Sequence, residues 1–152
     1  GPLWKTDAQD RLKGHKRALA EFGLSYDPNS LYEGNFQEEG GYRGMEHLLQ
    51  MGGRNSAVVC ANDEMAAGAL GVAREKGLVI PDDVSVMGFD NMFFTRYFRP
   101  KLSTVNNPVS EMGQMAARCV LKKVYDRKDL KIQHIFEPTL VMRSSINCKT
   151  GP

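Results

Sequence analysis

The sequence has no long apolar run and almost no net charge. No stretch approaches the ~18 consecutive apolar residues of a membrane-spanning helix, so no such helix is expected in this chain. The formal net charge is only +2, and the basic residues are scattered apart from short clusters at 13–17 and 122–123. A nucleic-acid-binding surface concentrates more positive charge than this. The chain by itself is therefore not expected to bind DNA or a membrane.

Cysteine and histidine are scarce, and they stand at no metal-ligand spacing. The three cysteines, an odd number, fit reduced thiols in a cytoplasmic protein. The three histidines have no cysteine or carboxylate partners at spacings that would build a metal site. We therefore expect no metal and no cofactor. The residues concerned are Cys60, Cys119, Cys148, His15, His47 and His134.

Catalytic motifs are also missing. The sequence contains no Gly-x-Ser-x-Gly elbow, no close pairing of His with Cys or Ser, and no glycine-rich loop that would cradle a phosphate. The paired acids Asp82 and Asp83 stand in a predicted turn. An enzyme is not expected, and detectable turnover of a sugar by this chain would contradict that expectation.

The sequence does contain a regular alternation of strand and helix patterns. Apolar, β-branched runs such as 57–61 and 84–89 alternate with helical patterns, and two consecutive strand–helix units imply a parallel sheet and an α/β fold. At 152 residues, 41% apolar and 25% charged, the chain is long enough for one globular domain. The predicted helices are 6–22, 38–51, 63–76 and 108–125, and the predicted strands are 31–33, 57–61, 84–89, 102–106, 132–136 and 139–143.

Polar side chains follow two neighbouring strands of this predicted sheet. Asn62 comes directly after the strand 57–61, and Asp90 comes directly after the strand 84–89. In open parallel sheets, ligands sit in the crevice outside the carboxyl ends of the strands. Asn62 and Asp90 are therefore expected where a small molecule would be held.

Two motifs carry a resemblance to a known family. The run Ala-Asn-Asp-Glu-Met-Ala-Ala-Gly-Ala at 61–69, followed by Pro-Asp-Asp-Val-Ser-Val-Met-Gly-Phe-Asp at 81–90, resembles the LacI/GalR family of bacterial transcription repressors. Further segments fit the same family in order and spacing, so the resemblance covers residues 1–146. Within the family, 89–100 and 136–141 look most like the galactose operon repressors. The further segments are 1–2, 11–14, 100–105, 111–113 and 138–145.

The resemblance implies a two-lobed, periplasmic-binding-protein-like core with a doubly wound parallel sheet. Residues 1–107 would be its carboxy-terminal lobe, and 108–131 a helix of an amino-terminal lobe that is mostly missing. Closing strands at 132–146 and a tail at 147–152 would follow. The helix-turn-helix head of the family is absent here, and we interpret the chain as truncated at its amino terminus. Operator DNA would then be bound only through that missing head.

Three polar residues are the leading candidates for contact with a sugar effector. The resemblance places Arg11 where the family has an arginine that reaches sugar hydroxyls, and a guanidinium fork suits vicinal hydroxyls. The alternative is a surface arginine paired with an acidic neighbour on its helix. Asp90 would accept hydrogen bonds from hydroxyls, or else cap the turn that begins at Asn91. Asn62 would contact ligand, or else cap its helix, although Asp63 is available for capping.

Three further residues complete the expected ligand site. Phe36 resembles the aromatic that the family stacks against its effector, because sugar C–H groups pack on aromatic faces; it could also plug the core. Trp4 could line the cleft. Asn107 lies at the crossover to the other lobe, where residues face the cleft or satisfy backbone groups.

An aromatic cluster after Asp90 points to self-association. Interfaces are rich in Phe, Tyr, Met and Arg, and the family pairs this segment and the helix after the Asn-Asp-Glu motif with their two-fold mates. Base stacking on nucleic acid is the alternative, but no basic groove accompanies the cluster. We expect a homodimer, with the interface formed by Ala66, Ala69, Leu70, Phe93, Phe94, Tyr97 and Phe98.

The helix predicted at 108–125 carries an apolar stripe whose own lobe is expected to be missing. The stripe either docks on this chain's sheet or packs on another copy, because a large exposed apolar patch is costly. We favour packing on another copy. The stripe comprises Val109, Met112, Met115, Ala116, Cys119 and Val120.

These observations predict the effector-binding and dimerising part of a cytoplasmic, galactose-responsive transcription repressor. Sugar in the cleft would contact both lobes and shift their relative orientation, and so alter the spacing of two DNA-binding heads. The alternative is a periplasmic sugar-binding protein, which shares the two-lobed core but would be monomeric. Solution mass distinguishes the two.

Overall fold

The computed structural model describes residues 1–52 and 55–147. Cys148 and nearly all of the expected tail lie outside these residues. Within them the helices are α1 (Thr6–Glu21), α2 (Glu38–Gln50), α3 (Asp63–Glu75) and α4 (Val109–Val124), with short 3-10 turns η1 (Pro28–Ser30) and η2 (Phe93–Arg96). The strands are β1 (Ala57–Val59), β2 (Ser85–Met87), β3 (Thr104–Asn106) and β4 (Thr139–Val141).

The strands form two small two-stranded sheets, one parallel and one antiparallel. β1 pairs with β2 in parallel, with Val58 opposite Val86. Parallel bridges from Met87 to Ser103 and from Asp90 to Asn106 continue this pairing towards β3. β3 and β4 then pair antiparallel. The chain crosses from β1 to β2 through α3, and this crossover makes the pairing parallel, as the sequence pattern predicts.

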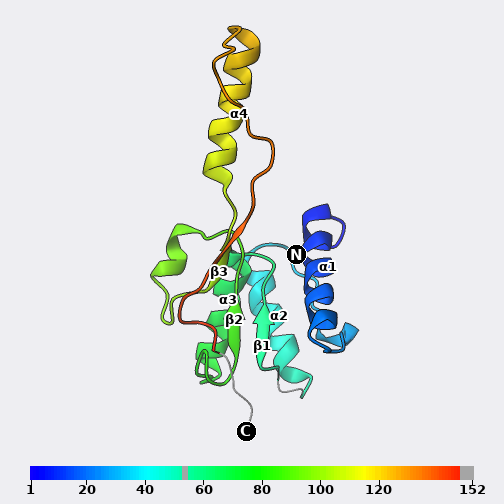
Figure 1. Cartoon of the computed structure of the whole chain (residues 1–152). Coiled ribbons are helices and arrows are strands. Elements are labelled where there is room, and N and C mark those ends of the chain that lie inside the picture. The colour runs from blue at the N-terminus through cyan, green and yellow to red at the C-terminus, as the bar shows by residue number, and fades with distance from the viewer. Residues whose placement is uncertain (53–54, 148–152) are drawn as a thin grey trace.

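The core lies where α3 packs against α2 and β2 (Figure 1). Two glycines permit the close approach of the helices. A Cβ on Gly41 would lie within 1.8 Å of the Met65 carbonyl oxygen, and a Cβ on Gly68 within 2.0 Å of the Glu38 carbonyl oxygen. The buried cluster around this contact comprises Met45, Cys60, Met65, Ala66, Ala69, Val72, Ala73, Val84, Val86 and Leu102.

Two of the predicted strands do not form. Residues 31–33 are not assigned to a strand, and a cavity of about 530 Å³ lies between this segment and β1. Residues 132–136 form no strand either and run beside α4 (Figure 1). A strand requires a neighbouring backbone at hydrogen-bonding distance, whatever the β propensity of its own residues. The structure supplies no such neighbour to either segment within the described residues.

Helix α4 stands away from the rest of the chain (Figure 1). None of its residues is buried, and Val109 and Val120 keep 61% and 59% of their surface exposed. The apolar stripe therefore does not dock on this chain's own sheet. Packing on another copy stays a prediction. A helix long and apolar enough to cross a membrane is not found among the described residues.

Candidate functional site

Three polar side chains meet at the carboxyl ends of the parallel strands. An Arg11 Nη atom from α1 lies 3.9 Å from Asp90 Oδ1, and Asn107 Nδ2 donates to the same oxygen over 3.4 Å. The second Nη atom of Arg11 donates to the carbonyl of Ala61, at the end of the β1 segment. The Arg11 and Asp90 side chains are 24% and 28% exposed, so both reach solvent. Segments far apart in the chain thus place a donor fork and a carboxylate side by side.

Aromatic rings flank the Arg11 guanidinium. The ring centroid of Phe89 lies 4.1 Å from Arg11 Cζ, and that of Phe36 lies 5.5 Å away. Such contacts fix the plane of the guanidinium and favour its charge. Sequence reasoning identified Phe36 but missed Phe89, which it counted only as the last residue of a strand. The arrangement offers hydrogen-bonding groups beside an apolar face, as recognition of a polyhydroxylated ring requires.

Both ends of the Asn62 side-chain amide make hydrogen bonds within the protein. Its Oδ1 accepts from the Met65 amide and caps α3, and its Nδ2 donates to the Phe36 carbonyl over 2.8 Å. The alternative in which Asn62 caps its helix is therefore confirmed, and Asp63, although available, does not serve as the cap. Asn62 holds Phe36, whose φ is +67°, next to Arg11. A direct contact between Asn62 and ligand stays a prediction.

Asp63 is fully buried beneath the site. Its carboxylate accepts from the Thr104 hydroxyl over 2.6 Å and from the Met92 amide over 2.7 Å. Burial raises the pKa of Asp63, and these two hydrogen bonds oppose that rise. The carboxylate joins the start of α3, β3 and the segment after Asp90. Local patterns could not indicate this role, because the partners lie 29 and 41 positions away.

The raised pKa of Asp63 predicts a pH signature in stability. The folded chain holds the Asp63 proton more tightly than the unfolded chain, whose carboxyl titrates near 3.8. The contribution of Asp63 to folding free energy should thus become less favourable as pH rises from 3.8 through the folded pKa. Urea unfolding of the wild type and of Asp63→Asn from pH 3 to 7 measures this contribution by difference. A difference that moved in the opposite direction with pH would contradict the raised pKa.

Trp4 lies at the edge of the group. It is 77% exposed, and Lys5 Nζ lies 5.2 Å from its ring centroid and 5.7 Å from that of Phe36. The structure thus brings together Arg11, Asp90, Asn107, Phe36 and Asn62, and leaves Trp4 largely in solvent. Lining of a cleft by Trp4 stays a prediction.

Comparison with known proteins identifies the domain. The family model for the periplasmic binding protein-like domain matches residues 3–146. The chain belongs to that family. Its most similar curated relatives and solved structures carry LacI/GalR-type names, and the family resemblance read from residues 61–69 and 81–90 is thereby confirmed.

The curated relatives are transcription regulators. Over 146 residues the chain is 38% identical to the ribose operon repressor of Haemophilus influenzae, covering 96% of this chain and 44% of that protein. It is 41% identical over 142 residues to the HTH-type transcriptional regulator GalR of Escherichia coli, covering 93% and 41%. It is 36% identical over 152 residues to the HTH-type transcriptional repressor PurR of Glaesserella parasuis, covering 96% and 45%. The chain spans less than half the length of these relatives.

Solved structures confirm the fold. A sugar-binding transcriptional regulator of the LacI family from Escherichia coli, complexed with phosphate, superposes with a TM-score of 0.82 at 36% identity, covering 90% of this chain and 49% of that one. A LacI family regulator from Enterococcus faecium with bound ribose gives a TM-score of 0.80 at 29% identity, covering 91% and 51%. The periplasmic-binding-protein-like fold predicted from the sequence is confirmed.

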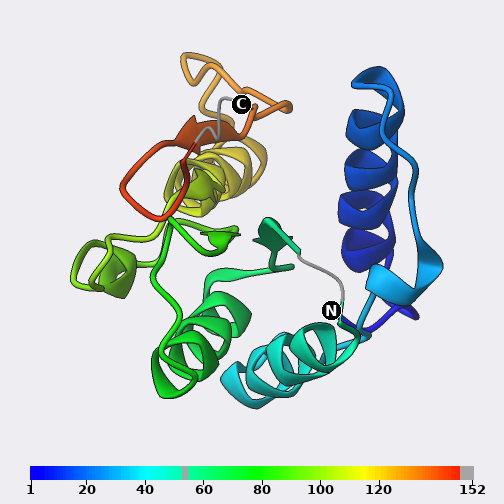
Figure 2. The same ribbon diagram turned by 90° about the horizontal axis from the view of Figure 1, so that it is seen from below.

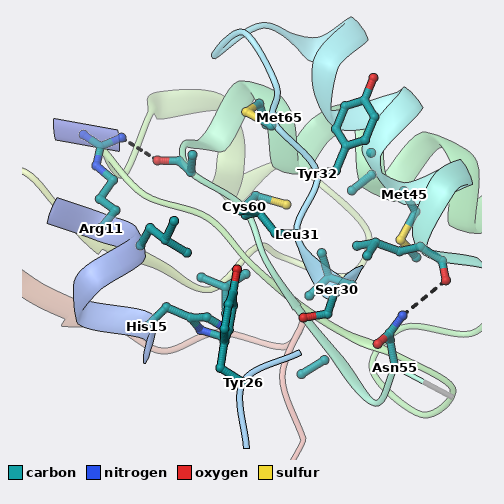
Figure 3. A pocket seen from close by; sticks show the side chains of 18 of the residues that line it. Arg11, His15, Tyr26, Ser30, Leu31, Tyr32, Met45, Asn55, Cys60 and Met65 are labelled. Atoms are coloured by element: carbon teal, nitrogen blue, oxygen red, sulfur yellow. Dashed lines mark hydrogen bonds between the residues drawn. The ribbon is translucent and has the colours of Figure 1, made fainter. Parts of the chain in front are cut away.

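The periplasmic binding protein-like domain also contains a cavity that adjoins the Arg11–Asp90 group and has Arg11 in its lining (Figure 3). It lies between α1, the segment 24–32 and β1, and His15 and Tyr26 point into it from one side. Arg11 is at its edge, where it bonds the Ala61 carbonyl. Figure 2 shows α1 and the following segment standing apart from the sheet on this side. The cavity separates the 31–33 segment from the free edge of β1.

The expected interface residues fall into three groups. Ala66 and Ala69 are 0% and 1% exposed and pack in the core between α3 and α2, so their assignment to a partner surface is wrong. Successive residues of an α-helix point in directions about 100° apart. The prediction assigned to the partner surface two residues that lie on the inward face of α3. Phe93 and Tyr97 are 69% and 70% exposed and remain available to a partner. The half-buried members are Leu70, Phe94 and Phe98, of which Leu70 and Phe98 pack against the core cluster.

Proposed function

We propose that this chain is the effector-binding and dimer-forming part of a longer, cytoplasmic LacI/GalR-type transcription regulator. The proposal rests mainly on the pairing of Arg11 with Asp90 at the carboxyl ends of the parallel strands, with Phe36 and Phe89 beside it. The regulator names of the relatives support the assignment. No catalytic role is proposed for any of these residues.

The arrangement suits a sugar effector. The Asp90 carboxylate accepts hydrogen bonds from hydroxyls, and the Arg11 fork donates to them, while Phe36 offers an apolar face to ring C–H groups. Asn107 would orient the Asp90 carboxylate through its bond over 3.4 Å. The solved relative with bound ribose is a precedent for a sugar in this family.

Galactose is our proposal for the particular sugar. It rests on the resemblance of 89–100 and 136–141 to galactose operon repressors and on the 41% identity to GalR. The ribose and purine repressor names among the relatives supply the competing effectors.

A further part of the proposal is the division of the regulator into two lobes. We propose that residues 1–107 form most of the carboxy-terminal lobe, that 108–131 belong to the amino-terminal lobe, and that 132–146 close the connection between them. The separation of α4 from the rest of the chain supports this division. Operator DNA would be bound by an amino-terminal head outside this sequence.

A dimer is favoured over a monomeric, periplasmic-type sugar-binding protein. Phe93 and Tyr97 expose large aromatic side chains on one short segment, and exposed aromatics of this kind are characteristic of interfaces. Sedimentation equilibrium of the complete regulator should give twice the monomer mass. A monomer at micromolar concentration would favour the periplasmic-type alternative.

Calorimetric titration tests the effector. The complete regulator and this chain alone would each be titrated with galactose, ribose, glucose and a purine base. We expect saturable galactose binding by the complete regulator and loss of most of it in the chain alone, because the second lobe supplies the rest of the site. If the complete regulator bound only ribose or only the purine base, galactose would be ruled out as the effector. If it bound none of these compounds, the proposed sugar effector would be contradicted.

A further inference from the structure

The Asp90 carboxylate is presented by a backbone turn that most residues avoid. Asp90 has a φ of +108° and Asn91 a φ of +57°, two successive positive values outside glycine. Such conformations cost free energy and persist only where the surroundings hold them. The contacts that hold this turn therefore decide where the Asp90 carboxylate points.

The Asn91 side chain is held at both ends of its amide. Its Nδ2 donates to Asn106 Oδ1 over 3.0 Å, and its Oδ1 accepts from Arg143 Nη2 over 2.6 Å. The Asp90 amide donates to the Val105 carbonyl over 2.8 Å, which ties the turn to β3. The turn is thus clamped between β3 and the residue two positions after β4.

Further hydrogen bonds hold the Arg143 guanidinium in place. Its Nη1 donates to the Leu102 carbonyl over 2.6 Å and to Thr95 Oγ1 over 3.1 Å. Leu102 and Thr95 are both fully buried, so the guanidinium has a fixed base from which to reach Asn91. A planar, bidentate donor suits this geometry, and lysine could not reproduce it.

We propose that Arg143 is a positioning residue for the effector site: by holding Asn91, it fixes the left-handed turn that presents Asp90. This inference rests on the proposed function of Asp90. Arg143 follows β4, and β3 and β4 lead to and from α4, so the same contact ties the orientation of Asp90 to the connection between the two lobes. Arg143 acts through Asn91 and is not itself a ligand contact.

The first test uses the ligand-free chain. In Arg143→Gln, we expect the Asn91 and Met92 amides to exchange with solvent about tenfold faster, because the turn loses a charge-assisted hydrogen bond. Amides of α3 should keep their rates. Arg127→Gln removes an exposed arginine whose ion pair, among the residues that the structure describes, is the local one with Asp129, and it serves as the matched control. Unchanged exchange at Asn91 and Met92 would overturn the proposal.

The second test is a double-mutant cycle read by galactose affinity of the complete regulator. Arg143→Gln should weaken binding about tenfold, the loss expected for one charge-assisted hydrogen bond. In an Asn91→Gly background, which tolerates positive φ but lacks the amide, the same change should cause no further loss. Additive losses would show that Arg143 acts by another route and would overturn the proposal.

Two controls separate this proposal from the proposed function. If Asp90→Asn leaves sugar binding intact, the assignment of Asp90 fails, whereas the exchange experiment still decides whether Arg143 holds the turn. If Asp90→Asn loses binding while Arg143→Gln keeps it, the positioning role alone fails. Should Arg143→Gln not fold, Asn91→Gly breaks the same contact and leaves the other Arg143 bonds in place.

Discussion

Gly41→Ala is expected to destabilise the fold by about 3 kcal/mol or more, at the upper end of the range for overpacked cores. An added Cβ would lie 1.8 Å from the Met65 carbonyl oxygen, which is backbone and cannot rotate away. The α2–α3 contact would have to open, and this contact encloses most of the buried cluster. Denaturant unfolding followed by circular dichroism measures the change.

Gly14→Ala is the matched control for that substitution. Gly14 also lies within a helix, but an added Cβ there has no neighbour within 4 Å. Alanine is the better helix former, so this variant should gain about 0.5–1 kcal/mol. Equal effects at Gly41 and Gly14 would show that the close packing of α2 on α3 does not exist in solution.

Arg11→Ala is expected to weaken sugar binding by about a hundredfold, because it removes a charged donor and leaves Asp90 without its guanidinium partner. Folding stability should also fall, by about 1–2 kcal/mol, because Arg11 is only 24% exposed and its hydrogen bond to the Ala61 carbonyl is lost as well. Titration calorimetry of the complete regulator gives the affinity, and thermal unfolding gives the stability. Operator binding should survive, whereas its release by sugar should be lost.

Arg17→Ala provides the comparison on the same helix. The Arg17 side chain is 80% exposed, and within the described residues its ion pair is with Glu21, over 3.4 Å. Its removal should leave sugar affinity within twofold of the wild type, because an exposed local pair contributes about 0–1 kcal/mol and faces solvent. An Arg11→Ala variant that bound sugar as well as Arg17→Ala would contradict the proposed site.

The sequence predicted those features that depend on neighbouring residues. The helices α1 to α4 and the four strands stand close to their predicted ranges, because capping, glycine stops and apolar periodicity are local signals. The segments 31–33 and 132–136 failed as strands because strand formation requires a partner backbone that no local pattern reveals. Ala66 and Ala69 were assigned to the wrong side because an alanine-rich helix gives little contrast between its faces.

The candidate site shows the same division. Arg11, Asp90 and Phe36 were reached through family motifs and strand ends. Asp63 and Arg143 were missed, since their partners lie up to 52 positions away along the chain. The sequence also left open whether Asn62 contacts ligand or caps α3, because either Asn62 or Asp63 could cap the helix and only the fold decides which one faces inward. Hydrogen bonds between distant segments are thus the part of a site that a single sequence conceals.

The pairing of β3 with β4 makes the region between these strands, which contains α4, an insertion into the rest of the fold. Asn106 stands opposite Thr139, so the chain leaves the main body and returns to it at adjacent positions. Residues between them could be exchanged for a short hairpin turn without altering how the remaining strands pair. The outer part of this chain could therefore be replaced through two junctions, one after Asn106 and one before Thr139, while β3 and β4 keep their pairing.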